Sequence, residues 1–213
     1  MNPEFLALSI IILLFSVILH EVMHGYVALK FGDRTALNAG RLTLNPIPHI
    51  DLVGTLLLPF IFLVLPLLTG VHSGFFIGWA KPVPINPLNF KDIKKGELAV
   101  SLGGIGANFA LALIGTLGYH LSSNMGNYLL SSVFQFTVGI NLMLGVFNLL
   151  PIPPLDGSKV LLTLLPYDLA KEYQKLSPYG IFLLLALLYL NVISFILSLI
   201  IFPLYSILGV PPF

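Results

Sequence analysis

Residues 20 to 24 read His-Glu-Val-Met-His, which is an HExxH motif. On a helix, side chains four positions apart lie on the same face, so the imidazoles of His20 and His24 can bind one zinc ion. Glu21 lies beside that face, where its carboxylate can act as general base toward a water molecule. The motif therefore predicts a zinc site with a hydrolytic base next to it.

The surroundings of the motif decide between this interpretation and two simpler ones. HExxH can be a chance match, or its histidines can form hydrogen bonds inside a helical bundle without binding metal. The segment before His20 is apolar from Phe5 onward. An ionisable side chain in a membrane costs several kcal/mol, so such side chains are usually retained only where function requires them. Three such side chains in a row of five residues favour the metal site.

A third ligand is needed, because catalytic zinc sites usually have three protein ligands and one open position. The chain has no cysteine, so this ligand is a histidine or a carboxylate. Asp156 is the strongest candidate, because it follows the prolines of residues 151 to 154, which unwind a helix. Unwound backbone at membrane depth is tolerated where it is buried or lines a watery cavity. The alternative role for Asp156 is the N-cap of a helix beginning at Gly157.

Composition places the chain in a membrane. Hydrophobic residues make up 57% and charged residues 9% of the 213 residues, and the mean hydropathy is +0.97. Apolar stretches long enough to cross a bilayer recur along the whole chain. A formal net charge of +1 gives no support to nucleic-acid binding.

The sequence predicts an all-α polytopic membrane protein. Helices are expected over residues 5–31, 52–70, 97–121, 128–150 and 179–208. Residues 74–87 are rich in glycine and proline and predict an extended loop, whereas residues 159–177 predict an amphipathic interfacial stretch. Residues 33–51 predict a strand or turn at the interface, and Asn191 is a candidate break in the last helix. The expected architecture is one membrane-embedded domain over residues 1–213, a bundle of about four to six transmembrane helices with a re-entrant or extended segment.

The proposed ligands also constrain the topology. The HExxH motif lies near the end of the first helix and Asp156 lies beyond the end of helix 128–150, so these two helices must run in the same direction. Residues 52–96 must then return to the side that they left, either as a re-entrant unit or by crossing twice. This topology puts all ten basic residues on one face: Lys30, Arg34, Arg41, Lys81, Lys91, Lys94, Lys95, Lys159, Lys171 and Lys175. The positive-inside rule makes that face cytoplasmic.

Other polar residues of the apolar segments have structural interpretations. Asn108 and Asn141 lie in predicted spanning helices and are expected to bridge neighbouring helices. His49 and Asp51 could form a second cation site. The more economical interpretation makes Asp51 the N-cap of the segment that begins at residue 52, with His49 as an interfacial neighbour.

Three segments carry a family resemblance: HEVMH at residues 20–24, SLGGIGANF at 101–109 and NLLPIPPLDG at 148–157. Together they resemble the signature elements of the site-2 protease family of intramembrane metalloproteases. The flanking segments GRLTLNPIPHIDLVGTLLLP and GWAKPVPINP are similar to the compact prokaryotic branch without PDZ or CBS domains, so the match covers nearly the whole chain. One departure is Ile105, which stands where the family usually has proline.

The resemblance implies roles for five residues. It implies that Glu21 is the catalytic acid and base, and that His20, His24 and Asp156 hold one zinc ion per chain. Asn148 corresponds to a family asparagine that helps to hold the substrate or the oxyanion.

The implied function is an intramembrane metalloendopeptidase, which uses zinc-activated water to cut transmembrane segments of single-pass proteins. It would be a multi-pass protein of a prokaryotic cell membrane, embedded in the lipid bilayer, with its active site nearer the cytoplasmic face. Two alternatives remain open: an ion or metal transporter, and a non-catalytic membrane scaffold. Substrate identity, regulation and oligomeric state do not follow from the sequence.

Overall fold

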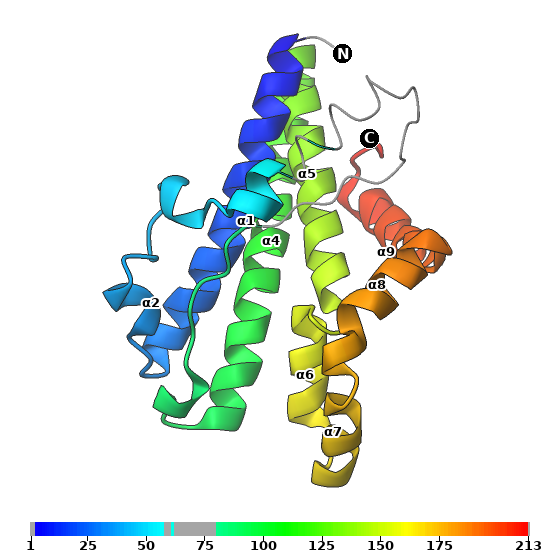
Figure 1. The fold of residues 1–213 in the computed structure, drawn as a ribbon. Helices are drawn as coiled ribbons and strands as arrows, with labels where there is room; N and C mark the ends of the chain where they lie inside the picture. Colours follow the sequence, from blue (N-terminus) through cyan, green and yellow to red (C-terminus); the bar gives the residue numbers. More distant parts are fainter. Residues whose placement is uncertain (1–2, 58–60, 62–79, 213) are drawn as a thin grey trace.

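The computed structural model describes residues 3–57, 61 and 80–212 (Figure 1). All regular secondary structure in these residues is helical, and none of them forms a strand. The prediction of an all-α fold is confirmed.

Three long helices form the centre of the molecule: α1 (Pro3–Lys30), α4 (Ile93–Asn124) and α5 (Tyr128–Leu149). Each is long and apolar enough to cross a membrane. The side chain of Asp92 caps α4 by accepting from the Lys95 N–H, and that of Asn127 caps α5 by accepting from the Leu130 N–H.

The directions of the three helices agree with the topology inferred from the ligands. α4 begins at the end of the bundle where α1 finishes, and a short turn joins it to the antiparallel α5 (Figure 1). α1 and α5 therefore run in the same direction. The chain between α1 and α4 starts and finishes at one end of the bundle.

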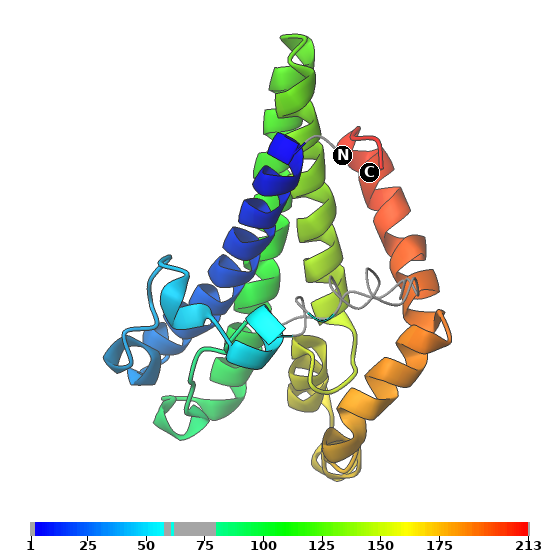
Figure 2. The ribbon, with the colours of Figure 1, turned by 45° about the horizontal axis from the view of Figure 1, so that its top comes forward.

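The other described elements are shorter helical segments around this bundle (Figure 2). They are α2 (Thr35–Asn38), η1 (Ile47–His49), η2 (Leu52–Leu57), η3 (Pro87–Asn89), α6 (Asp156–Leu164), α7 (Tyr167–Gln174), η4 (Ser177–Tyr179), α8 (Gly180–Tyr189) and α9 (Val192–Leu208). The strand or turn expected within residues 33–51 is thus two short helical turns joined by loops, and the interfacial stretch 159–177 contains helices α6 and α7.

Part of the second predicted helix, and part of the predicted loop, lie outside the described residues. The helix expected over 52–70 is described as η2 and at residue 61, and the rest is not described. Asp51 caps η2 as expected, since its carboxylate accepts from the N–H groups of Val53 and Gly54. Of the loop expected over 74–87, residues 80–86 have no regular secondary structure and lead into η3, and residues 74–79 lie outside the description.

The last predicted helix is broken at Asn191. Asn191 has φ 58°, in the left-handed region, and the segments before and after it are bent by 74°. The described residues therefore contain three helices that could each span a membrane, or four spans if the bent pair counts as one. With the bent pair counted, the number reaches the low end of the expected four to six.

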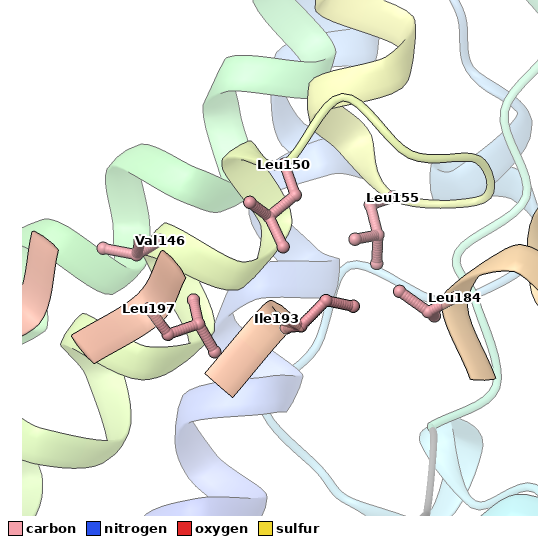
Figure 3. Packing of buried hydrophobic residues seen from close by; sticks show 6 residues of the cluster. All are labelled: Val146, Leu150, Leu155, Leu184, Ile193 and Leu197. Carbon is pink, nitrogen blue, oxygen red and sulfur yellow. The ribbon is translucent and has the colours of Figure 1, made fainter. Parts of the chain in front are cut away.

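The broken helix packs against α5 through a small apolar core. Figure 3 shows the side chains that meet there: Val146, Leu150, Leu155, Leu184, Ile193 and Leu197. Leu155 directly precedes Asp156, so this core fixes the turn that carries the predicted third ligand.

A buried carboxylate ties the end of α1 to the segment before α4. Asp33 has no exposed surface, and its oxygens accept hydrogen bonds from the backbone N–H and hydroxyl of Thr35, from the Asn86 N–H and from the Asn89 side chain. Burial raises the pKa of Asp33, but these hydrogen bonds outweigh it and hold the pKa below its ordinary value. The ionised form of Asp33 therefore connects α1 to residues 86–89.

We expect Asp33→Ala to lower the thermal unfolding temperature of the detergent-purified protein. The variant leaves several N–H donors without their acceptor, at a cost of about 1–3 kcal/mol per buried group. Because the folded-state pKa is lowered, the stabilisation is present at neutral pH and is lost as the pH falls below about 3.9. The difference from wild type should shrink in acid. The exposed Asp168→Ala is the control, and equal unfolding temperatures for the two variants would contradict the prediction.

Candidate metal centre

Three predicted ligands from two distant parts of the chain meet at one point. The Nε2 atoms of His20 and His24 lie 2.9 Å apart, and Asp156 Oδ2 lies 3.2 Å from the first and 2.9 Å from the second. All three residues are buried, with exposed fractions of 5–7%. Within the described residues, these three form the one group of at least three potential ligands that could hold a metal ion.

Helix α4 orients both histidine rings from behind. The Nδ1 atom of His24 lies 2.7 Å from the backbone carbonyl oxygen of Val100, and that of His20 lies 2.7 Å from Oδ1 of Asn108. Each Nδ1–H can donate to its oxygen partner, which leaves the lone pair of Nε2 available for a metal ion. Because α4 is antiparallel to α1, Val100, which comes before Asn108 in α4, contacts His24, which comes after His20 in α1.

Gly104 makes room for the two rings. A Cβ atom at this position would lie 2.5 Å from His24 Nε2 and 2.7 Å from His20 Cε1, which is closer than nonbonded atoms approach. A Cβ atom at Gly106, in contrast, would meet no atom within 4 Å.

The turn before α6 brings Asp156 to the histidines. The prolines end α5, and Gly157 then packs so closely on the last carbonyls of α5, those of Leu149 and Leu150, that a side chain would collide with them. Asp156 is the first residue of α6, and Leu155 is its N-cap. The alternative role of Asp156 as an N-cap is therefore not observed. Lys159 Nζ lies 3.0 Å from Asp156 Oδ1, which leaves Oδ2 directed at the imidazoles.

This donor set fits zinc. Two imidazole nitrogens and one carboxylate oxygen are common ligands of catalytic zinc, and atoms bound to one tetrahedral ion at about 2.1 Å lie about 3.4 Å apart. The observed separations of 2.9–3.2 Å are slightly smaller, so an ion needs only a small expansion of the triangle. The hydrogen-bonded Nδ1 atoms supply the support that metal-bound histidines usually have.

Glu21 and Asn148 face the same space. A cavity of about 200 Å³ is lined by the three potential ligands and, among others, by Glu21, Asn148, Lys159, Pro82, Val83 and Ile85. Glu21 Oε2 accepts a hydrogen bond of 2.9 Å from the Val83 N–H. Asn148 donates one amide hydrogen to the Leu144 carbonyl, which leaves the other amide hydrogen for a group in the cavity.

The segment that holds Glu21 is itself anchored by Arg41 and His49. Arg41 is buried, and its Nη2 donates to the carbonyls of Lys81 at 2.6 Å and Pro82 at 3.3 Å. The Lys81 N–H donates to the His49 carbonyl. His49 is 1% exposed, and it forms no metal-ligand group with Asp51 in the described part of the chain. The sequence predicted a loop here from its glycines and prolines, but it did not indicate the contacts of Arg41 and His49 with that loop.

We expect Gly104→Ala to weaken zinc binding by about 10-fold or more, because the added methyl group displaces both rings, and disturbed ligand orientation typically has an effect of this size. Gly106→Ala on the same helix is the control and should bind zinc like wild type. Zinc affinity is measured by competition with a chelating dye. Equal affinities for the two variants would show that Gly104 does not set the ligand geometry.

Comparisons with known proteins give this geometry a family. Residues 121–188, which contain Asn148 and Asp156, match the model of peptidase family M50. The chain is 36% identical over 195 residues to YwhC of Bacillus subtilis (strain 168), whose name assigns it provisionally to the zinc metalloproteases; the match covers 88% of this chain and 83% of that protein.

More distant relatives have similar names. The zinc metalloprotease MJ0392 of Methanocaldococcus jannaschii is 28% identical over 209 residues, covering 94% of this chain and 49% of the relative. Rip2 of Mycolicibacterium smegmatis, also provisionally named a zinc metalloprotease, is 32% identical over 145 residues, or 68% of this chain and 52% of Rip2. The chain thus spans about half the length of these two relatives. No solved structure matches significantly.

The apolar helices and these matches identify a multi-pass membrane protein and agree with the resemblance drawn from the three sequence motifs. The chain belongs to peptidase family M50, the site-2 protease family.

Proposed function

We propose that this protein is a zinc metalloendopeptidase that cuts peptide bonds within the membrane, with His20, His24 and Asp156 as zinc ligands. The single observation that carries the proposal is the buried His-His-Asp group on membrane helices, with the Glu21 carboxylate beside it in one cavity. Membership of family M50 supports the same reaction.

Glu21 is proposed as general acid and base. When bound, zinc supplies Lewis acidity, which polarises a carbonyl group and makes a water molecule more acidic. Glu21 then takes a proton from the attacking water and passes it to the leaving amine. The Val83 N–H fixes one oxygen of Glu21, which leaves the second oxygen for these proton transfers. Asn148 would donate its remaining amide hydrogen to the oxyanion or to the substrate.

The proposed substrate is a transmembrane segment of a single-pass protein. A helical peptide shields its carbonyl carbons, so the substrate must be locally unwound before it reaches the cavity. One wall of that cavity is formed by Pro82, Val83 and Ile85. Carbonyl groups along such a wall could accept hydrogen bonds from an extended peptide.

Neither alternative function gains support from the relatives, since the three described above carry zinc metalloprotease names and none is named a transporter or a scaffold. A transporter or scaffold also has no need for the Glu21 carboxylate beside two potential metal ligands.

The proposed location is a prokaryotic cell membrane, with the metal centre nearer the cytoplasmic face. Lys30 at the end of α1, Lys95 at the start of α4 and Lys159 in α6 all lie at one end of the bundle, and the turn from 125 to 127 at the other end has no basic residue. The positive-inside rule favours the cytoplasm for the lysine-rich end.

We expect Glu21→Gln to retain bound zinc while cleavage of a model transmembrane substrate falls by about 10²–10⁴-fold, the usual contribution of a general base. Glutamine keeps the oxygen that can accept from Val83 but cannot accept the water proton. Metal content and cleavage are measured on the same detergent-purified sample. Glu97→Gln is the control, because Glu97 does not line the cavity. Zinc-loaded Glu21→Gln that cleaves at the wild-type rate would refute the assigned base.

The absence of cysteine permits a direct test of orientation. A cysteine at Met125, which is 81% exposed, should react with a membrane-impermeant maleimide added to intact cells. A cysteine at Lys95, whose side chain is 79% exposed, should react only after the membrane is permeabilised. The reverse pattern would put the metal centre nearer the outer face.

A further inference from the structure

The two histidines have different kinds of partner at Nδ1. The partner of His24 is the Val100 carbonyl, which can only accept, so it requires the Nδ1–H tautomer. The partner of His20 is the side-chain amide of Asn108, which presents an acceptor if its oxygen faces the ring and a donor if its nitrogen does. Some other group must determine which end of the Asn108 amide faces His20.

That group can be traced through a second amide. The Asn141 amide nitrogen lies 2.9 Å from the Thr137 backbone carbonyl and 2.9 Å from the Ser16 hydroxyl. Because a backbone carbonyl only accepts, the Asn141 nitrogen must face it, and the Asn141 oxygen then faces Asn108. The Asn108 nitrogen donates to that oxygen at 3.0 Å, which turns the Asn108 oxygen toward His20.

We propose that Asn108 and Asn141 are positioning residues that fix the tautomer of His20, with the Thr137 carbonyl as their fixed reference. The chain of hydrogen bonds from the Thr137 carbonyl to His20 requires the proton of the His20 ring to be on Nδ1. Nε2 then presents its lone pair at the metal centre. The inference rests on the proposed zinc site.

Burial makes this arrangement stringent. Asn108 and Asn141 have no exposed surface and Ser16 is 1% exposed, so no bulk water can replace a lost partner. Reversing the Asn108 amide would put a donor against the His20 N–H and would leave two oxygens facing each other at Asn141. The network joins α1, α4 and α5, so the orientation of a ligand on one helix depends on the backbone of another.

Zinc affinity of a graded set of variants tests the proposal. Asn108→Leu removes the acceptor and should weaken zinc binding by about 10–100-fold, the range for loss of a partner to a metal-bound histidine. Asn108→Asp, as a neutral carboxylic acid, keeps an oxygen acceptor toward His20, and its hydroxyl can donate to the Asn141 oxygen as the amide nitrogen does, so it should retain wild-type affinity. Asn141→Leu leaves the Asn108 oxygen in place but removes its reference, so an intermediate loss is expected. Thr116→Val removes a buried hydroxyl of α4 away from the site and serves as the control.

A spectroscopic signature separates tautomer control from packing. In the Co²⁺-substituted protein, the Nδ1–H protons of metal-bound histidines give exchangeable, strongly shifted proton NMR signals. Wild type and Asn108→Asp should show two such signals, and Asn108→Leu should show one of them lost or moved.

The outcomes are distinguishable. Wild-type zinc affinity and two unchanged signals in Asn108→Leu would overturn the inference, as would equal losses of affinity in Asn108→Leu and Asn108→Asp. If Asn108→Leu does not fold, Asn141→Leu decides: affinity equal to that of Thr116→Val overturns the inference. A wild-type protein that binds neither zinc nor Co²⁺ would instead refute the proposed function.

Discussion

The structure depends on how an apolar bundle accommodates two imidazoles and a carboxylate away from bulk water. Each imidazole has an oxygen partner behind it, from the Val100 backbone or the Asn108 side chain, and its other nitrogen faces Asp156. Gly104 then allows α4 to come close enough to supply these oxygens. Buried polar groups are costly unless each has a partner, so the imidazoles need these oxygens. The close packing of α4 on α1 is therefore necessary for the site as well as for the fold.

The ligand-bearing part of the fold follows from the sequence because strong signals coincide there. Spacing puts His20 and His24 on one helical face, and the prolines before Asp156 place a carboxylate directly after unwound chain. Requiring these groups to meet is sufficient to orient α1 and α5 in parallel, as the structure shows. The low charge and long apolar stretches predict the helical membrane class for the same reason: the bilayer leaves helices as the main way to satisfy the backbone.

The roles of the residues that support the ligands and the cavity wall could not be predicted from the sequence, because the patterns around them are ambiguous. Asn108 and Asn141 were correctly expected to bridge helices, but only their donor and acceptor directions reveal a link to His20. A buried Arg41 is rare and contradicts the usual preference of arginine for solvent, so no pattern points to its contact with residues 81–82. The break at Asn191 is visible in sequence, whereas its 74° bend and the packing of the broken helix against α5 are seen only in the structure.

Two hydrogen bonds between α1 and α4 fix the position of one helix along the axis of the other. Val100 and Asn108 meet His24 and His20 from opposite directions, and one residue of sliding, about 1.5 Å along a helix, would misalign both hydrogen bonds at once. The pair therefore moves as a rigid unit whenever the ligand geometry is intact. Any movement that admits a peptide to the cavity must take place in elements that support neither histidine.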